Sequence, residues 1–261
     1  MRLLVIVNFK YNCTNNDVQY TWCTMTVLVV SNLDLSEKLQ ALKPAAFLES
    51  TIKDTTINLN SDYRYLKTGY YVSLHAEVLG NQVIPSCENI IDASRTPILL
   101  LRASRAKIPT LPFVVTDSVK KIIEEIKLPV VVFAVNPFIH EGYELARNKS
   151  ALYRAMKSLG MNYKFTVCAV PLRGEMVTVK SVFGKSESQE FNDISEKVYE
   201  VFKIPLCKLH IQKADGKAFL CGLEPLNTTQ LTQSDVETIS KEILLISQQG
   251  EPFSVKDRMF C

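Results

Sequence analysis

Short apolar runs alternate with amphipathic stretches along most of the chain. The runs are four to seven residues long, and this alternation is typical of α/β units. We expect strands at residues 26–32, 45–49, 55–59, 82–86, 113–117 and 129–135. We expect helices at residues 34–42, 69–79, 98–106, 118–127, 148–160, 191–203 and 234–246.

The second half of the chain carries two patterns typical of β-hairpins. Strand-like runs at 164–172 and 176–183 flank Arg173-Gly174-Glu175, and a second pair at 207–213 and 217–223 flanks Ala214-Asp215-Gly216. A glycine between two such runs permits the positive φ that a tight turn needs. These runs therefore predict antiparallel strands.

The order of these elements predicts an α/β (α+β) chain in two main parts. Residues 25–94 form a small α/β domain, and a change of composition at residues 94–97 begins a second region, 95–261, with a central lobe (95–162) and a C-terminal lobe (163–261). Residues 1–24 are polar and irregular, and Met25 directly precedes a strand. We therefore expect residues 1–24 to be either an extension or the product of a mis-assigned start.

Composition limits the partners. The net charge is +3 and the pI is about 8.4, and the basic residues are scattered, so we expect no nucleic-acid partner. No apolar run approaches ~18 residues, so we expect no membrane span and no membrane partner. We expect a cytoplasmic protein. The oligomeric state stays open, a homo-oligomer included.

The chain has seven cysteines, an odd number without metal-ligand spacing. Cys168, Cys207 and Cys221 lie inside strand-like runs, which predicts buried free thiols in a reducing compartment. A catalytic cysteine paired with a histidine is the alternative.

Four tyrosines stand close together before and at the start of the helix expected at 69–79. The spacing of Tyr71, Leu74 and Val78 predicts the buried face of that helix. The cluster is either a packed aromatic start of the helix or a substrate pocket in which an arginine faces a carboxylate. The substrate-binding candidates are Tyr63, Arg64, Tyr65, Tyr70, Ser73 and Glu77.

The segment INLNSDYRYLKTGYYVSLHAEVLGNQVIPS, residues 57–86, resembles the N-terminal domain that precedes RimK-like ATP-grasp ligases. The resemblance implies an ATP-grasp-like fold, in which a small N-terminal pre-ATP-grasp unit is followed by central and C-terminal lobes with antiparallel hairpins. It also implies that ATP and Mg²⁺ bind between these lobes. The activity it implies is ATP-dependent ligation of a carboxylate to an amine, with a small molecule or a peptide as substrate.

The residues that such chemistry needs are partly displaced. The position that the resemblance assigns to a phosphate-binding lysine is Phe133, and the phosphate loop at 136–142 has a single glycine. The expected Glu-x-Asn is absent at its usual place, and Glu224 and Asn227 lie three residues further on with a wider spacing. A catalytically degenerate ATP-grasp scaffold that binds a small molecule or a protein is therefore the alternative function. A further alternative is that residues 26–94 are the working part, as a binding module.

Two sets of candidates follow from the resemblance. Glu224, Asn227 and His210 are the candidate metal ligands. Lys180, Lys208, His140 and Glu141 are the candidate nucleotide-binding residues. The structural alternatives are a strand-end turn for Glu224 and Asn227 and a histidine bonded to its neighbours for His210. For Lys180 and Lys208 the alternative is a solvated surface lysine.

Overall fold

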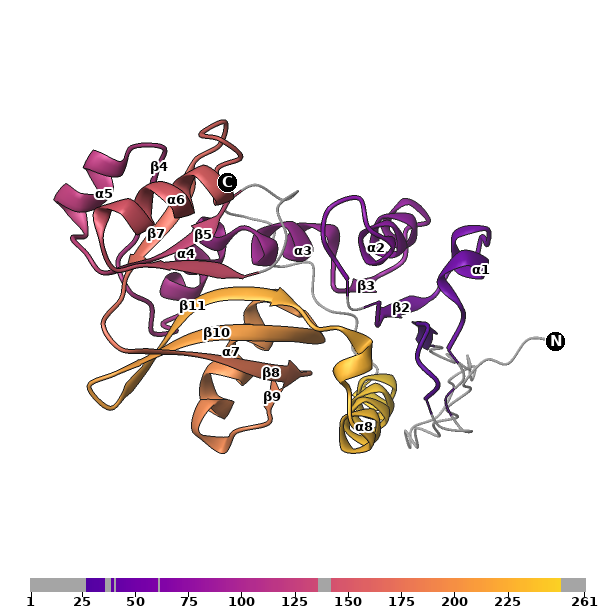
Figure 1. Ribbon diagram of the computed structural model, residues 1–261. Coiled ribbons are helices and arrows are strands. Elements are labelled where there is room, and N and C mark those ends of the chain that lie inside the picture. Colours follow the sequence, from indigo (N-terminus) through magenta and orange to yellow (C-terminus); the bar gives the residue numbers. More distant parts are fainter. Residues whose placement is uncertain (1–26, 36–38, 40, 61, 136–141, 250–261) are drawn as a thin grey trace, which may run out of the picture.

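A computed structural model describes residues 27–35, 39, 41–60, 62–135 and 142–249. It contains one three-stranded parallel sheet and two four-stranded antiparallel sheets (Figure 1). The expected α/β architecture, with a small N-terminal unit followed by antiparallel lobes, is confirmed. The predicted extension 1–24 and the candidates His140 and Glu141 lie outside the described residues.

The N-terminal sheet has the order β1-β2-β3. Its strands are β1 (Val27–Val30), β2 (Thr55–Asn58) and β3 (Val83–Ile84). Helices α1 (Pro44–Leu48) and α2 (Thr68–Val78) belong to this unit. Parallel strands need crossover connections, which these helical segments provide.

Two expectations near the N-terminus are wrong. The strand expected at 45–49 is instead α1, because Pro44 stands in its first turn, where a proline favours a helix start. The described residues of the helix expected at 34–42 are not helical.

The face that α2 buries also differs from the prediction. Tyr71 is 43% exposed and Val78 is 76% exposed, whereas Val72 and Ala76 are buried with Phe47. The start of the helix sets this rotation, because a Cβ at Gly69 would lie 2.5 Å from the Asp62 carbonyl oxygen. Only glycine permits this approach. The side of α2 that carries Gly69 therefore packs inward, and Val72 and Ala76 lie on that same side.

The central sheet has the order β4-β7-β5-β6. Its strands are β4 (Val114–Thr116), β5 (Val130–Ala134), β6 (Tyr143–Ala146) and β7 (Val167–Pro171). Helices α5 (Val119–Glu125) and α6 (Lys149–Leu159) cover its outer face (Figure 1). Their apolar stripes form one core with β4, β5 and β7.

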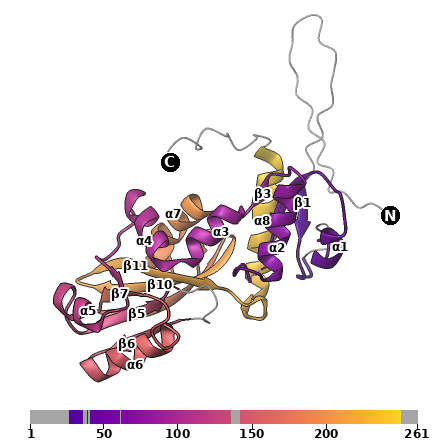
Figure 2. The same cartoon turned by 90° about the horizontal axis from the view of Figure 1, so that it is seen from above.

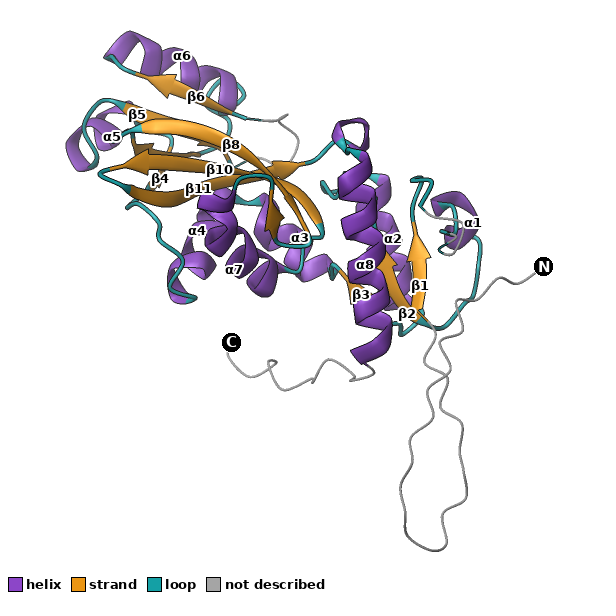
Figure 3. Ribbon diagram, turned by 90° about the horizontal axis from the view of Figure 1, so that it is seen from below, coloured by secondary structure: helices purple, strands orange, loops and turns teal. Residues whose placement is uncertain are grey.

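The C-terminal sheet has the order β11-β10-β8-β9. Its strands are β8 (Glu175–Val182), β9 (Lys185–Ser186), β10 (Leu206–Ala214) and β11 (Lys217–Pro225). Helices α3 (Cys87–Ser94), α4 (Thr96–Arg105) and α7 (Asn192–Phe202) pack on one face of it (Figure 3). Its other face meets the central sheet through a core that includes Phe133 and Cys221.

One of the two expected hairpins is correct. The strands β10 and β11 pair across Asp215 and Gly216, both with positive φ. The hairpin expected around Arg173-Gly174-Glu175 is wrong, because β7 pairs with β4 and β5 while β8 pairs with β9 and β10. The backbone N–H groups of Arg173 and Gly174 donate to the Gln212 side chain, so this segment carries the chain from one sheet to the other.

Helix α8 (Gln233–Gln249) lies beside the N-terminal sheet, far in sequence from its strands (Figure 2, Figure 3). Ile239 and Ile243 on α8 share a core with Ile57 and Leu206. The short helix η2 (Thr228–Gln230) leads into it, and η1 (Gln189–Phe191) precedes α7. The C-terminal helix therefore packs between the first and third sheets. The domain boundary at 94/95 stays a prediction.

The expectation of buried thiols is confirmed for the described cysteines. Cys168, Cys207 and Cys221 are buried and free, as is Cys87. Burial raises the pKa of each thiol to about 12. Such a pKa leaves almost no nucleophilic thiolate at neutral pH, which argues against the alternative of a catalytic cysteine at these positions.

Candidate functional site

A pocket opens between the central and C-terminal sheets, beside residues 63–65 of the N-terminal unit. Phe133 and Ala134 at the end of β5, with Gly142 before β6, form one wall, and the strands β10 and β11 form the opposite wall. The segment 63–65 and the connection from α3 to α4 close a third side. The described lining residues are Tyr63, Arg64, Tyr65, Ile90, Ala93, Ser94, Thr96, Phe133, Ala134, Gly142, Ile204, Leu206, His210, Leu223, Glu224 and Pro225.

The pocket brings together five of the predicted site residues. Tyr63, Arg64 and Tyr65 come from the predicted substrate site, and His210 and Glu224 come from the predicted metal site. The two groups are far apart in sequence, so only the tertiary fold places them at one cavity. The functional roles predicted for them stay predictions.

Strand register brings His210 and Glu224 in the pocket wall together with Lys208, which does not line the pocket itself. Lys208 lies directly opposite Glu224 in the β10–β11 pair, and His210 lies opposite Gly222. Because side chains two residues apart on a strand share a face, all three polar groups point to the same side. The Lys208 ammonium donates to Glu224 Oε1 at 3.2 Å, and His210 Nε2 lies 3.1 Å from Glu224 Oε2.

These contacts fix the protonation of Glu224 and the tautomer of His210. The hydrogen bond from His210, together with Lys208, lowers the pKa of Glu224 from 4.5, so the carboxylate is ionised at neutral pH and only accepts. His210 Nε2 must therefore donate to it. In the neutral imidazole Nδ1 then accepts from the Thr178 hydroxyl, 3.0 Å away.

Two aromatic rings from the central sheet cover His210. The Tyr143 ring centroid lies 5.0 Å from that of His210, and the Phe133 centroid lies at 6.2 Å. Burial and the nearby Glu224 charge raise the pKa of Tyr143. Gly222 makes room for this packing, because a Cβ there would lie 2.8 Å from Phe133 Cε1.

The opposite rim of the pocket carries a cation. Arg64 Nη2 and Asp62 Oδ2 are 2.8 Å apart in an ion pair that is partly exposed. Tyr65 beside it is 40% exposed and its ring contacts Tyr70 at a centroid distance of 5.2 Å. Arg64 therefore reaches the pocket already oriented by a neighbouring carboxylate.

The remaining predicted substrate residues have structural contacts. The hydroxyl of Tyr63, which also lines the pocket, donates to the Asn58 carbonyl at 2.8 Å. Ser73 is fully buried and donates to the Pro85 carbonyl. Glu77 accepts from the backbone N–H of Cys87 at the start of α3. Tyr70, Ser73 and Glu77 do not line the pocket.

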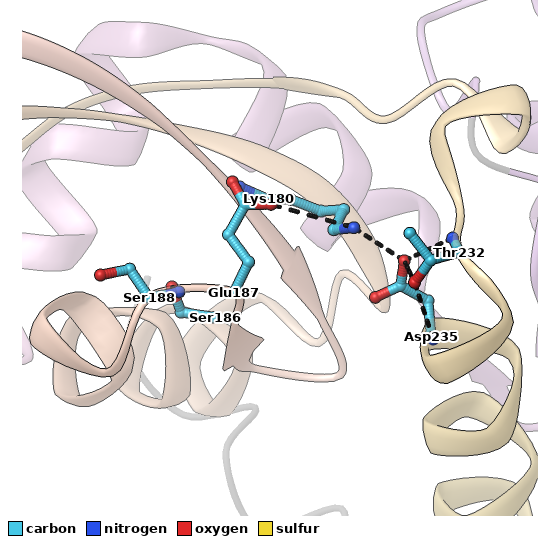
Figure 4. Close-up of polar contacts among 6 residues, drawn as sticks. All are labelled: Lys180, Ser186, Glu187, Ser188, Thr232 and Asp235. Atoms are coloured by element: carbon cyan, nitrogen blue, oxygen red, sulfur yellow. Dashed lines mark hydrogen bonds and ion pairs between the residues drawn. The ribbon is translucent and has the colours of Figure 1, made fainter.

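Lys180 and Asn227 are also placed outside the pocket. Lys180 lies 2.7 Å from Asp235 Oδ2 and 3.9 Å from Glu187, and Figure 4 shows its side chain directed toward α8. Asp235 accepts in turn from Thr232 at the start of that helix. Asn227 caps the short helix η2 through a bond from the Thr229 N–H.

The described pocket residues fit Mg²⁺ and a triphosphate poorly. Magnesium prefers an octahedral set of oxygen ligands, and Glu224 is the one carboxylate among the described residues that line the pocket, with both oxygens bonded to cationic or imidazole donors. Within the described ranges no group of three or more His, Cys, Asp or Glu could hold a metal ion. The position expected for a phosphate-binding lysine, Phe133, is 3% exposed and apolar.

Three residues that contact His210 escaped the sequence analysis as site candidates, and of these only Phe133 lines the pocket. Phe133, Tyr143 and Thr178 contact His210 from two different sheets. Alternation along the β8 strand could have placed Thr178 on the same face as Lys180. Nothing in the sequence indicates that Phe133 and Tyr143 meet His210, because their contact depends on how the two sheets are stacked.

The fold and the pocket define a class of protein. Two antiparallel sheets that face each other across a cavity, preceded by a small parallel α/β unit, are the ATP-grasp architecture. The chain belongs to the family described as the RimK-like ATPgrasp N-terminal domain, whose model matches residues 44–242. The resemblance noted for residues 57–86 is therefore confirmed.

Solved structures support the fold at low identity. A RimK domain ATP-grasp protein from Sphaerobacter thermophilus DSM 20745 matches with a TM-score of 0.56 and 12% identity, covering 85% of this chain and 96% of that one. D-alanine–D-alanine ligase from Bacillus anthracis matches with a TM-score of 0.54 and 14% identity, covering 87% and 100%.

A third match is the ATP-grasp ligase PsnB in complex with a minimal precursor, Mg and ADP. It has a TM-score of 0.50 and 13% identity, covering 69% of this chain and 68% of that one. The chain spans 65% of another PsnB structure. A search of curated proteins found no match.

The comparisons establish an ATP-grasp family protein that resembles ATP-grasp ligases at low identity. Among the residues that the structure describes, no helix is both long and apolar enough to cross a membrane.

Proposed function

We propose that this protein is a catalytically degenerate ATP-grasp scaffold that binds a small molecule in the pocket between its sheets without magnesium-dependent phosphoryl transfer. The observation that carries the proposal is the state of Glu224. Its two oxygens are bonded to Lys208 and His210, so the charge that a metal ion would neutralise is already balanced by protein groups. Phosphoryl transfer needs metal ions and cations around the phosphates.

The pocket walls favour a flat ligand with one polar edge. Most of the described lining is apolar or aromatic, and the polar exceptions include Arg64, His210 and Glu224. Pockets of this kind bury a ring against apolar walls and orient it through a few polar groups. A nucleoside has these properties, with a planar base for the apolar walls and hydroxyl or amino donors for Glu224. Nucleotide binding by a protein with a similar fold, as in the PsnB complex with Mg and ADP, supports this class.

Calorimetry on the whole protein tests the proposal. Adenosine, ADP and ATP are titrated with and without Mg²⁺, and ADP release is measured across mixtures of amino acids and short peptides. We expect heat with adenosine-bearing compounds, little change on adding Mg²⁺, and no ADP release. No heat from any of them at millimolar concentration would exclude the ligand class.

A matched pair of variants locates the binding. Glu224→Gln removes the pocket carboxylate, and we expect roughly tenfold weaker binding from the loss of a charge-assisted hydrogen bond. Glu175→Gln removes the same charge from an exposed position at the start of β8, outside the pocket lining, and should leave binding unchanged. Equal effects of the two variants would place the ligand elsewhere.

The second candidate is an active ATP-dependent carboxylate–amine ligase that acts on amino acids or peptides. The position of the pocket favours it, because the cavity lies between the two antiparallel sheets, where the resemblance places ATP. This candidate requires Mg²⁺-dependent ATP binding and ADP release that depends on an amine and a carboxylate. If both are observed, the ligase replaces the scaffold.

A further inference from the structure

The segment that forms α6 and the turn after it has an unusual composition. Residues 147–165 contain five Lys or Arg and no Asp or Glu, while the net charge of the whole chain is only +3. The five are Arg147, Lys149, Arg154, Lys157 and Lys164. These basic residues are clustered in one helix and its flanks, in contrast to the scattered distribution on which the expectation of no nucleic-acid partner was based.

These basic side chains are exposed and unpaired within the part of the chain that the structure describes. All five residues are exposed, and none of them takes part in an ion pair with a described acidic residue. The neighbouring helix α5 is different, because Lys120 and Lys121 face Glu124 and Glu125 at i,i+4 spacing. The surface of α6 thus keeps its full positive charge.

Exposed aromatic rings are interleaved with the basic residues. Lys149, Tyr153 and Lys157 are four residues apart and so lie in one line along the helix. Tyr153 is 45% exposed, and Tyr163 and Phe165 in the following turn are each 42% exposed. The Lys149 ammonium lies 6.0 Å from the Tyr153 ring centroid. Cations and ring faces therefore occur on the same outer surface.

Two hydrogen bonds tie the turn after α6 to the helix, one from the Tyr163 side chain and one from the Phe165 backbone. The Tyr163 hydroxyl donates to the Tyr153 carbonyl at 3.2 Å, and the Phe165 N–H donates to the Gly160 carbonyl at 3.0 Å. Rings that are about half exposed and held in this way offer a face for stacking, whereas membrane insertion needs side chains that protrude into the lipid. Figure 1 places α6 on the outer side of the central sheet, at the opposite end of the molecule from the N-terminal sheet.

We propose that α6 and the turn 160–165 bind single-stranded nucleic acid without strong sequence preference. Basic side chains that follow the phosphates and aromatic rings that stack on successive bases are the two elements of such sites. The surface lies outside the lining of the pocket, so this proposal is independent of the proposed small-molecule function.

Fluorescence anisotropy with the whole protein and labelled 16-nucleotide oligo(dT) and oligo(rU) tests the proposal. We expect binding at low salt, with log K falling against log[salt] at a slope of up to about −3.5 if all five basic residues contact phosphates. No binding at 50 mM salt would overturn the proposal.

Charge variants test the role of the helix. The double variant Arg154→Gln/Lys157→Gln should weaken binding by about tenfold or more and reduce the magnitude of the salt slope by about 1.4. The matched control Lys120→Gln/Lys121→Gln removes the same charge from α5, where the lysines have acidic partners, and should change binding little. Equal losses in both variants would show that only overall charge matters, which overturns a site on α6.

A pair of ring variants tests stacking separately. Tyr153→Leu should weaken binding by about tenfold without changing the salt slope, and Tyr153→Phe, which keeps the ring, should bind as the unmodified protein does. If Tyr153→Leu also binds normally, stacking is not part of the site. Circular dichroism melting curves check that each variant is folded.

Competition with other polyanions tests the class of partner. Phosphatidylserine vesicles and polyglutamate are added to the bound oligonucleotide. If either binds as tightly, with the same dependence on Arg154 and Lys157, the partner is a lipid surface or an acidic protein and the nucleic-acid proposal is wrong.

Discussion

Two polar clusters of this protein include predicted site residues, Ser73 in one and His210 with Glu224 in the other, and they differ in what surrounds them. Under α2, Asn58, Asn60 and Ser73 form a closed network, in which Asn58 donates to the Gly69 carbonyl at 2.6 Å and to Ser73 Oγ at 2.8 Å. In the pocket, Glu224 and His210 form a cluster that borders a cavity.

The difference separates a structural cluster from a binding site. The closed network bonds mostly to backbone groups of the N-terminal unit, and its members are buried. The pocket cluster bonds only side chain to side chain, and the Glu224 side chain stays 14% exposed. Substitutions in the closed network should therefore mainly lower the free energy of unfolding, and substitutions in the pocket cluster should mainly weaken ligand binding.

The largest effect is expected from Asn58→Ala. This change removes the buried hydrogen bonds that the Asn58 side chain makes with the Gly69 carbonyl, the Ser73 hydroxyl and the Asn60 N–H, and the loss of several bonds in one buried network is costly. We expect the free energy of unfolding to fall by about 3 kcal/mol in chemical denaturation. Asn32→Ala, on an exposed residue, is the control and should cost less than about 0.5 kcal/mol. Equal losses would mean that the network is not structural.

A smaller loss of stability is expected from Gly222→Ala in the pocket. The new Cβ would lie 2.8 Å from Phe133 Cε1 and 3.2 Å from His210 Cδ2. Overpacking of this kind costs about 2 kcal/mol. The double variant Gly222→Ala/Phe133→Leu should regain part of that stability, because it removes the ring that is in the way. A double variant that is less stable than the sum of the single changes would contradict this account.

Lys180→Met tests the contact that joins the C-terminal sheet to α8 (Figure 4). The side chains of Lys180 and Asp235 are only 14% and 16% exposed, so Asp235 would lose a mostly buried partner. We expect a loss of about 1–2 kcal/mol in unfolding free energy, between the values for exposed and fully buried pairs. Lys120→Met, whose pair with Glu124 is exposed, should cost less than about 0.5 kcal/mol. A loss no greater than the control would show that this contact does not hold α8.

The sequence predicts the elements whose pattern is local. The hairpin of β10 and β11 and the helix α2 follow from periodicity and turn residues. The false hairpin between β7 and β8 has equally good local chemistry, but β8 pairs with β10, whose Gln212 side chain also accepts from the Arg173 and Gly174 N–H groups. These partners lie far away in the sequence, where local patterns carry no information.

The candidate site was predicted only in part, because it too depends on contacts between residues far apart in the sequence. Tyr63, Arg64, Tyr65, His210 and Glu224 reach one pocket, and the family pattern pointed to each group separately. Tyr70, Ser73 and Glu77 belong to the same family pattern, but they lie outside the pocket. Ser73 and Glu77 are instead bonded to backbone groups of Pro85 and Cys87. Residue type and spacing do not show which polar side chains already have hydrogen-bond partners within the folded protein.

The smallest effect is expected from the pH dependence of Glu224→Gln. The bond from His210 lowers the pKa of Glu224 below 4.5, so the folded state binds fewer protons than the unfolded state as the pH falls toward that value. The stabilisation is therefore fully present above pH ~4.5 and is lost as the pH falls through the lower folded pKa.

Denaturant unfolding at pH 6 and at pH 3 measures this contribution. The unmodified protein should exceed Glu224→Gln in stability by less than about 1 kcal/mol at pH 6, and the difference should shrink at pH 3. Asp62 and Asp235 also have lowered pKa values, but they are present in both proteins and cancel in the difference. A gap that widens at acid pH would mean that Glu224 is not held as an ionised group, and the basis for excluding a metal ion from the pocket would fall with it.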